Sequence, residues 1–148
     1  MAEFVTGKPL KDCLRSIFVN AKRELIIMSP YINLSDDIRK LLRRHINKEH
    51  LHLIIIFGKN EKDPNKSLLE EDFYFFKQFR YVSIIYAPNL HAKYYGNDHE
   101  SLTTSMNLIE YSLKNNIEFG SYFNHKLNIP TLFSEDSNVY NYVHRIIN

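Results

Sequence analysis

Four polar residues are spaced so that their side chains could act together on a phosphodiester. His91 and Lys93 stand two apart in one predicted strand, and Ser105 and Asn107 stand two apart in the next, with a turn predicted at residues 96–99. Alternate side chains of a strand share a face, and pairing across the turn would bring His91 close to the serine and the asparagine. Ammonium and amide groups donate hydrogen bonds to phosphate oxygens, and imidazole can attack phosphorus or transfer a proton near neutral pH. The spacing therefore predicts a phosphate-processing site.

Further residues extend this site. Glu118, on the next predicted segment, could accept a hydrogen bond from the second ring nitrogen of His91 and so set its tautomer. Two tyrosines are predicted to stack on a base and two arginines of a basic helical run to contact phosphates: Tyr31, Tyr94, Arg43 and Arg44. Such a basic run is also typical of a solvated helix face.

The elements that must position these residues follow from an alternation of apolar runs with amphipathic stretches. Strands are predicted at Glu24–Ser29, Leu51–Phe57, Tyr81–Tyr86, Leu90–Tyr95 and Ser101–Leu108, with a turn and a further strand within Asn115–Phe123. Helices are predicted at Pro9–Lys22, after the caps Ser35 and Ser67, and at Ser137–Ile147, the last serving only for packing. Apolar strands separated by helices indicate βαβ units covered on both faces. The sequence therefore predicts an α/β fold, one domain over residues 1–148, with a mixed sheet flanked by helices on both faces.

The composition is typical of a folded domain in a reducing compartment. The 148 residues are 44% hydrophobic and 24% charged, which excludes the disordered and low-complexity classes. The one cysteine, Cys13, cannot form an internal disulfide. The sequence shows neither a signal peptide nor an apolar run of the roughly 20 residues that a membrane span needs, so we expect a cytoplasmic protein with no membrane partner. The net charge of +2 permits an anionic partner without requiring one.

The polar residues also resemble the signature of a known family. His-Ala-Lys at 91–93, Asp98 after four residues, and Thr-Ser-Met-Asn at 104–107 resemble the H-x-K-x4-D…G-S-x-N motif of the phospholipase D superfamily. The stretch at 115–120 is similar to that family's trailing Asn-x-Glu element, and the stretch at 28–32 is similar to the end of its first strand. Two details differ: Thr104 stands where the family usually has glycine, and the spacing from Asp98 to Ser105 is one residue shorter than usual.

The resemblance implies a phospholipase D-like nuclease fold and a metal-independent endonuclease that needs no cofactor. It assigns His91 as the nucleophile, Lys93 and Asn107 as phosphate ligands, Ser105 as an orienting residue and Glu118 as the partner of the histidine. Asp98 matches the motif only weakly and is assigned no catalytic role. Family members with two motifs build one site from both, whereas this sequence holds one motif. The resemblance therefore implies a homodimer in which one His91 forms a phosphohistidine and the other protonates the leaving oxygen. DNA is favoured over RNA, and a restriction or defence role rests on analogy alone.

Two other functions stay open from the sequence. A lipid phosphodiesterase would need a groove for acyl chains, and a non-catalytic nucleic-acid-binding module would keep the fold without the chemistry. Strandedness, sequence specificity and the presence of a separate specificity domain are not determined by these residues. His50 and His52 could form a metal pair, but no cysteine or carboxylate cluster completes it, so no metal site is predicted.

Overall fold

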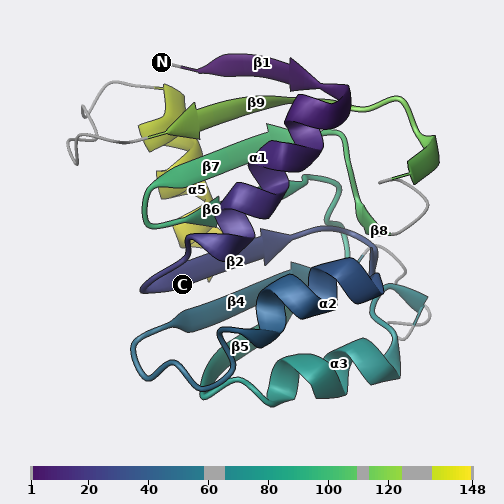
Figure 1. Cartoon of the computed structure of the whole chain (residues 1–148), viewed down its shortest axis with the longest axis vertical. Helices are drawn as coiled ribbons and strands as arrows, with labels where there is room; N and C mark the ends of the chain where they lie inside the picture. Colours follow the sequence, from purple (N-terminus) through teal and green to yellow (C-terminus); the bar gives the residue numbers. More distant parts are fainter. Residues whose placement is uncertain (1, 59–65, 110–113, 125–134, 148) are drawn as a thin grey trace.

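A mixed sheet of seven strands forms the centre of the computed structural model, which describes residues 2–58, 66–109, 114–124 and 135–147, without the side chains of 135–140 (Figure 1). The strand order is β1-β9-β7-β6-β2-β4-β5. The strands are β1 (Glu3–Thr6), β2 (Glu24–Met28), β4 (His52–Phe57), β5 (Tyr81–Tyr86), β6 (Tyr94–Asn97), β7 (Glu100–Thr104) and β9 (Phe119–Asn124). A separate two-stranded sheet pairs β3 (Ile32–Asn33) with β8 (Leu108–Ile109). The predicted loop at 60–66 lies outside the described residues except for Lys66.

The sheet has a parallel and an antiparallel half. Strands β2, β4 and β5 are parallel neighbours, as the apolar runs predict, and strands β6, β7, β9 and β1 continue the sheet in antiparallel register. Parallel strands need a crossover, and the helices between them supply it. The boundary between the halves is the pair β2 and β6, where Met28 lies opposite Tyr94. The βαβ prediction is therefore confirmed.

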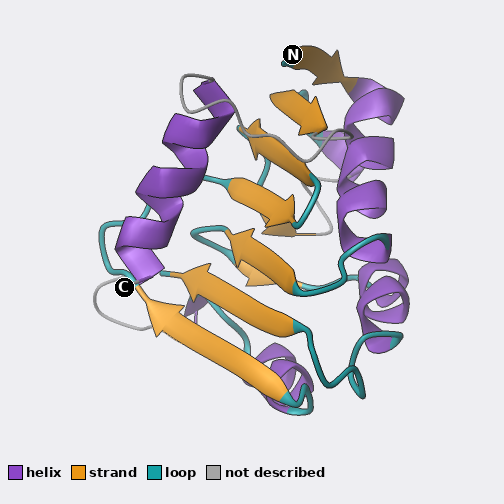
Figure 2. Ribbon diagram, turned by 90° about the vertical axis from the view of Figure 1, so that its left-hand side faces the viewer, coloured by secondary structure: helices purple, strands orange, loops and turns teal. Residues whose placement is uncertain are grey.

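Helices cover both faces of the sheet, as predicted. Alternate residues of β2 point to opposite faces, with Leu25 and Ile27 in one core cluster and Ile26 and Met28 in another. The first face packs against α1 (Gly7–Val19), α2 (Asp36–Arg43) and α3 (Glu70–Lys77), and the second against α5 (Glu135–Ile147) (Figure 2). None of these helices, over the described residues, is long and apolar enough to cross a membrane.

The two predicted serine caps have different outcomes. Ser35 caps α2, because its hydroxyl accepts a hydrogen bond from the backbone N–H of Ile38 (3.3 Å). Ser67 does not cap a helix, and that prediction is wrong. It is fully buried, and its carbonyl accepts from the N–H of Ile32 (2.8 Å), beside a β-bridge between Ile32 and Leu68. This bridge keeps the chain extended, so α3 begins at Glu70 instead.

A buried histidine should make the stability of the fold depend on pH. His45 is almost fully buried, and its Nε2 lies 2.6 Å from the carbonyl of Phe18, so Nε2 carries the proton. Its Nδ1 has no hydrogen-bond partner within the described residues. Burial lowers the pKa of His45, helped by nearby Lys48 and Arg44. The unfolded chain therefore binds the proton more readily than the folded chain.

We expect the free energy of unfolding to fall as the pH drops below the unfolded pKa of about 6.5, by at most about 1.4 kcal/mol per pH unit from this group. Urea unfolding from pH 7.5 downwards measures the slope. The variant His45→Gln should show a shallower slope. Equal slopes for the two proteins would contradict the assignment.

Candidate active site

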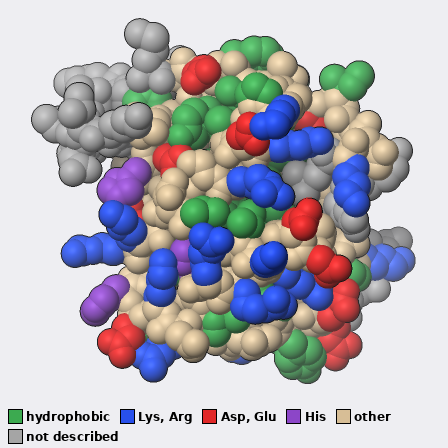
Figure 3. Space-filling model, viewed as in Figure 1, with side chains coloured by type: hydrophobic (Ala, Val, Ile, Leu, Met, Phe, Trp, Pro, Cys, Tyr) green, Lys and Arg blue, Asp and Glu red, His purple; other side chains and the backbone are tan. Residues whose placement is uncertain are grey.

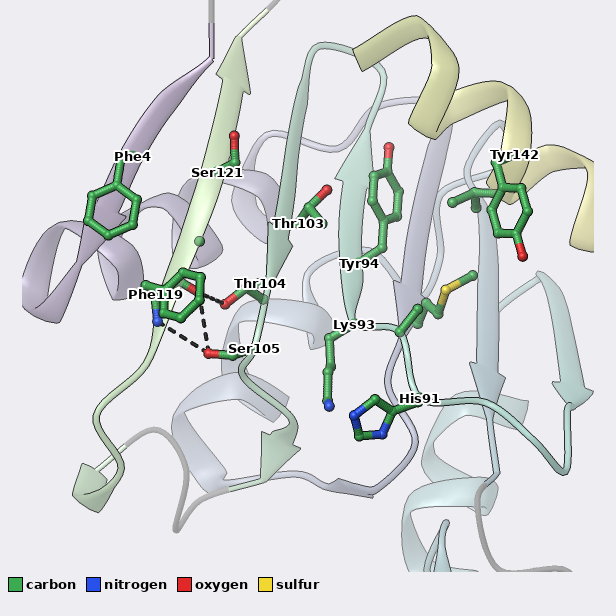
Figure 4. A pocket seen from close by; sticks show the side chains of 14 residues that line it. Phe4, His91, Lys93, Tyr94, Thr103, Thr104, Ser105, Phe119, Ser121 and Tyr142 are labelled. Atoms are coloured by element: carbon green, nitrogen blue, oxygen red, sulfur yellow. Dashed lines mark hydrogen bonds between the residues drawn. The ribbon is translucent and has the colours of Figure 1, made fainter. Parts of the chain in front are cut away.

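The candidate site lies at one end of the neighbouring strands β6 and β7, inside the strand order of the sheet. Tyr94 of β6 pairs with Thr103 of β7 in antiparallel register, so the residues before β6 and after β7 lie at the same edge. The N–H of Thr104 donates to the carbonyl of Lys93 (3.2 Å) and closes the pair there. As a result, His91, Lys93 and Ser105 line one end of a single pocket, although the lysine and the serine are 12 positions apart in the sequence (Figure 4).

The predicted hairpin is longer than the observed one. His91 and Lys93 precede the strand rather than lying in it, and β7 ends at Thr104 instead of reaching Leu108. The reason is that the next backbone groups find other partners. The N–H of Ser105 donates to the carbonyl of Phe119 (3.1 Å), and the N–H of Leu108 donates to the hydroxyl of Ser29 (3.0 Å). Cross-strand pairing beyond Thr104 is thereby replaced, yet the polar residues still converge.

The pocket has a volume of about 800 Å³, and His91, Lys93 and Ser105 form its polar end. The side chain of His91 is exposed and that of Lys93 is half-buried. Both point into the same end of the pocket, beside Ser105 (Figure 4). Burial removes part of the water that screens a charge, so the ammonium of Lys93 attracts an anion there more strongly than a fully exposed lysine would. This end of the pocket suits a phosphate group.

Glu118 contacts Ser105. The Ser105 hydroxyl donates a short hydrogen bond to Oε2 of Glu118, and Asn116 Nδ2 donates to Oε1 (3.2 Å). The same hydroxyl accepts from the N–H of Phe119 (3.2 Å), which ties the start of β9 to the end of β7. The Glu118 carboxylate therefore does not line the pocket itself but contacts Ser105, which does. Its predicted bond to the second nitrogen of His91 is not among these contacts and stays a prediction.

Asn107 is held by a residue that sequence reasoning did not single out. Ser29, fully buried at the end of β2, directs its hydroxyl proton at the carbonyl of Tyr31 (2.7 Å) and at Oδ1 of Asn107 (3.3 Å). It also accepts from the N–H of Leu108, so three segments meet at one hydroxyl. A serine directly after an apolar strand and before a proline was the available signal. Ser29 thus joins β2 to the segment that carries Asn107.

Thr104 and Asp98, the residues at the two departures from the family motif, both have hydrogen-bond partners in the structure. Thr104, in the place of the usual glycine, donates from Oγ1 to the carbonyl of Phe119 (2.6 Å) and accepts from the N–H of Met106 (3.2 Å), so the extra side chain is accommodated by internal bonds. Asp98 lies at the opposite end of the hairpin. Its Oδ2 accepts from the backbone N–H groups of Lys22 and Arg23 (2.8 Å each). Asp98 holds the hairpin to the segment before β2 and does not line the pocket.

The structure places the four residues predicted to contact substrate in different surroundings. Tyr94 lines the pocket but is only 4% exposed, so it offers little ring surface for stacking, whereas Tyr31 is half-buried near the site. Arg43 is the last residue of α2 and Arg44 is its C-cap. Because β2 and β4 are parallel, the chain between them must return from the end of the sheet that carries the site to the other end. Both arginines therefore lie at the end of the sheet away from the site. Lys and Arg side chains are spread over the middle of this helix-covered face (Figure 3). Arg43 and Arg44 do not line the pocket, and their contact with the phosphates of a longer strand stays a prediction.

Several residues that line the pocket were not predicted from the sequence. Phe4 and Phe119 line it from β1 and β9, and Tyr142 and Val143 line it from α5, a helix predicted to serve packing alone. Residues distant in sequence carry no pattern that predicts such a meeting. No group of three or more metal-ligating side chains occurs among the described residues. His52, one of the two histidines considered above as a metal pair, has its Nε2 2.8 Å from the Ser83 hydroxyl.

Several solved structures of other proteins have the same fold as this chain. The chain superposes on Nuc, a phospholipase D family member from Salmonella typhimurium, with a TM-score of 0.66 at 16% identity, covering 98% of this chain and 93% of that one. NucT from Helicobacter pylori gives 0.69 at 14%, covering 99% and 95%. Phosphatidylserine synthase from Haemophilus influenzae gives 0.64 at 13%, covering 84% and 33%. No family model matches the sequence, and no curated protein matches it. The chain has the fold of the phospholipase D superfamily.

Proposed function

We propose that this protein is a metal-independent phosphodiesterase that cleaves nucleic acid, with DNA as the favoured substrate, through a covalent phosphohistidine. The observation that carries the proposal is the meeting of His91, Lys93 and Ser105 at one end of a pocket in a phospholipase D fold. A nucleophile, a cation and an orienting hydroxyl at one point are the groups that phosphoryl transfer needs.

The proposed reaction has two steps. His91 attacks phosphorus with a ring nitrogen, the bond to the leaving oxygen breaks, and a second imidazole donates a proton to that oxygen. Water then gives a proton to the second imidazole and displaces His91 from phosphorus, which restores both groups. Each step concentrates negative charge on the non-bridging oxygens. Lys93 and Asn107 would stabilise this charge by hydrogen bonding.

The second imidazole is the reason for proposing a homodimer. Among the described residues, the other histidines do not line this pocket: His45, His50, His52, His99 and His144. His45 is buried under α1, and His144 lies 3.2 Å from Glu24 at the start of β2, away from the site edge. A second copy that brings its own His91 to the same phosphate would complete the acid–base pair. The exposure of His91 at the sheet edge leaves it accessible to such a partner.

Nucleic acid is preferred to lipid for two reasons. The chain matches Nuc and NucT over nearly their whole length, but it matches only a third of the phosphatidylserine synthase. The charge balance of +2 also tolerates a polyanion. A restriction or defence role would be the biological setting, by analogy with the family alone.

The test is cleavage of labelled single- and double-stranded DNA and RNA in EDTA, with His91→Ala purified in parallel to report contaminating nuclease. We expect cutting that survives EDTA, and transfer of phosphorus label to the protein in an acid-labile, alkali-stable bond. No cutting by a folded dimer would overturn the nuclease. Choline release from phosphatidylcholine would indicate the lipid enzyme instead, and tight DNA binding without cutting would indicate a binding module.

Removal of the Ser105 hydroxyl should slow the reaction without weakening substrate binding. In Ser105→Ala the Glu118 carboxylate loses its bond to the end of β7. A hydrogen bond to a charged group contributes about 1.5–3 kcal/mol, so we expect kcat to fall about 10- to 150-fold with KM little changed. Steady-state kinetics should show partial rescue by Ser105→Thr. Ser83→Ala, which removes a hydroxyl from β5, is the matched control. A change in KM alone would contradict a positioning role.

A further inference from the structure

The pocket continues from the phosphate end across the sheet face opposite α1. Three large side chains with exposed rings surround this extension: Phe4 of β1 is 71% exposed, Phe119 of β9 is 57% exposed and Tyr142 of α5 is 59% exposed. The two phenylalanine rings lie together, with centroids 5.9 Å apart. Met28 and Val143 are buried in its floor. Figure 4 shows this aromatic extension next to the end that holds His91.

The concentration of exposed rings in this pocket points to a ligand. Seven large hydrophobic side chains are exposed in the described part of the chain, and three of them line this one pocket. Single exposed hydrophobics are normal on a protein surface, but a group of them around a concave surface marks a binding site. A ring exposed on one face offers a stacking surface to a flat apolar ligand.

Two hydroxyl groups among the mostly apolar lining of the pocket favour a base over an acyl chain. Thr103 of β7 and Ser121 of β9 are direct cross-strand partners, both exposed, and both line the extension. Their hydroxyls can bond the nitrogen and oxygen atoms at a base edge, whereas an acyl chain would cover them without giving a partner. No Asp or Glu is among the described residues that line the pocket, so no acidic side chain opposes the adjoining phosphates.

We propose that the extension binds unpaired nucleobases next to the scissile phosphate, which makes single-stranded nucleic acid the substrate. This inference rests on the proposed phosphodiesterase function and assigns its substrate class. In a duplex the base faces are covered by stacking and the Watson–Crick edges by pairing, so the aromatic rings could not stack on a base there. In a single strand, the phosphate would sit at His91 and Lys93 while a neighbouring base stacks against Phe119 and Phe4.

The test compares strands that differ only in their bases. Binding is measured by fluorescence anisotropy in EDTA, on a His91→Ala background that prevents cutting. The probes are an oligothymidylate, a strand of equal length with abasic sugars, and a duplex. We expect the oligothymidylate to bind roughly 5- to 150-fold more tightly per stacked base than the abasic strand. Phe119→Ala should remove most of this difference and leave binding of the abasic strand unchanged. Tyr74→Ala, which removes an equally exposed ring (59%) from α3 on the other face, should change neither.

Several outcomes would overturn the proposal. They are equal binding of the base-bearing and abasic strands, a difference that survives Phe119→Ala, tighter binding of the duplex, and Phe119-dependent binding of phosphatidylcholine vesicles in place of the oligonucleotide. If sedimentation shows that Phe119→Ala separates a dimer while the base preference stays, this face is an interface and not a base site.

Cleavage of the abasic strand by protein with intact His91 tests the chemistry by itself. Base-dependent binding without any cleavage would count against the proposed phosphodiesterase and not against the base site.

Discussion

Replacement of His91 by alanine is expected to abolish cleavage, with a loss on the order of 10⁴-fold or more, the size seen when a nucleophile is removed from a catalytic unit. The imidazole is proposed to form the covalent bond to phosphorus, and alanine offers no atom that could do so. The fold should be unaffected, because His91 is exposed and lies outside the strands. Initial rates on a labelled oligonucleotide in EDTA measure the loss. His99→Ala, a change of the same kind in the turn at the far end of the hairpin, should retain full activity.

Mixing the variant with the wild type tests whether one site needs two histidines. If each active site uses His91 from both chains, random exchange between equal amounts leaves only about a quarter of the dimers with a complete site. If each chain acts alone, about half of the sites stay complete. The rate after equilibration, relative to an unmixed wild-type sample with the same total number of chains, separates the two cases. A rate near one half would rule out the shared site while leaving the nucleophile in place.

Loss of the buried carboxylate of Asp72 is expected to have the largest effect on stability. Asp72 is fully buried in α3, accepts from Nη2 of Arg39 (2.5 Å), and accepts from the N–H of Leu34 (3.1 Å). Arg39 also lies over the ring of Phe75, 5.8 Å from its centroid. Asp72→Ala would leave a largely buried guanidinium and a buried N–H without this partner. We expect about 3–5 kcal/mol of destabilisation, a large part of the total stability of an ordinary domain.

A matched control is available because Arg39 has a second carboxylate neighbour. Glu71 lies 3.5 Å from Nη2 of Arg39 but is 67% exposed, so solvent screens that pair. Glu71→Ala should therefore cost less than about 1 kcal/mol. Urea unfolding of the two variants and the wild type measures the difference. Similar costs for both would contradict the dominant role of the buried pair. The double variant Arg39→Met with Asp72→Leu should recover much of the loss, because it removes both charges together.

The sequence by itself determined the central part of the fold. After the polar first residues Glu24 and His52, the runs that form β2 and β4 are apolar, which is the composition of strands buried on both faces. The outermost strand β5 is mostly apolar too, but it is only partly buried. Ser35 and the acidic residues that follow it similarly predict the start of α2, because a cap acts through contacts within one turn. The polar residues His91, Lys93 and Ser105 were predictable as one site because they flank a single hairpin. Such features depend on neighbours close in sequence.

Only the tertiary structure determined which hydrogen-bond and packing partners each residue has. The strand β7 ends early because Phe119 and Ser29 take the backbone bonds that a longer hairpin would have used. Ser67 fails as a cap because Ile32 bonds its carbonyl. Likewise, Tyr94 is covered by the packing of α5, and the aromatic extension of the pocket gathers side chains from β1, β9 and the last helix. These outcomes depend on contacts between residues more than 10 positions apart, and such contacts leave no periodic pattern in a single sequence.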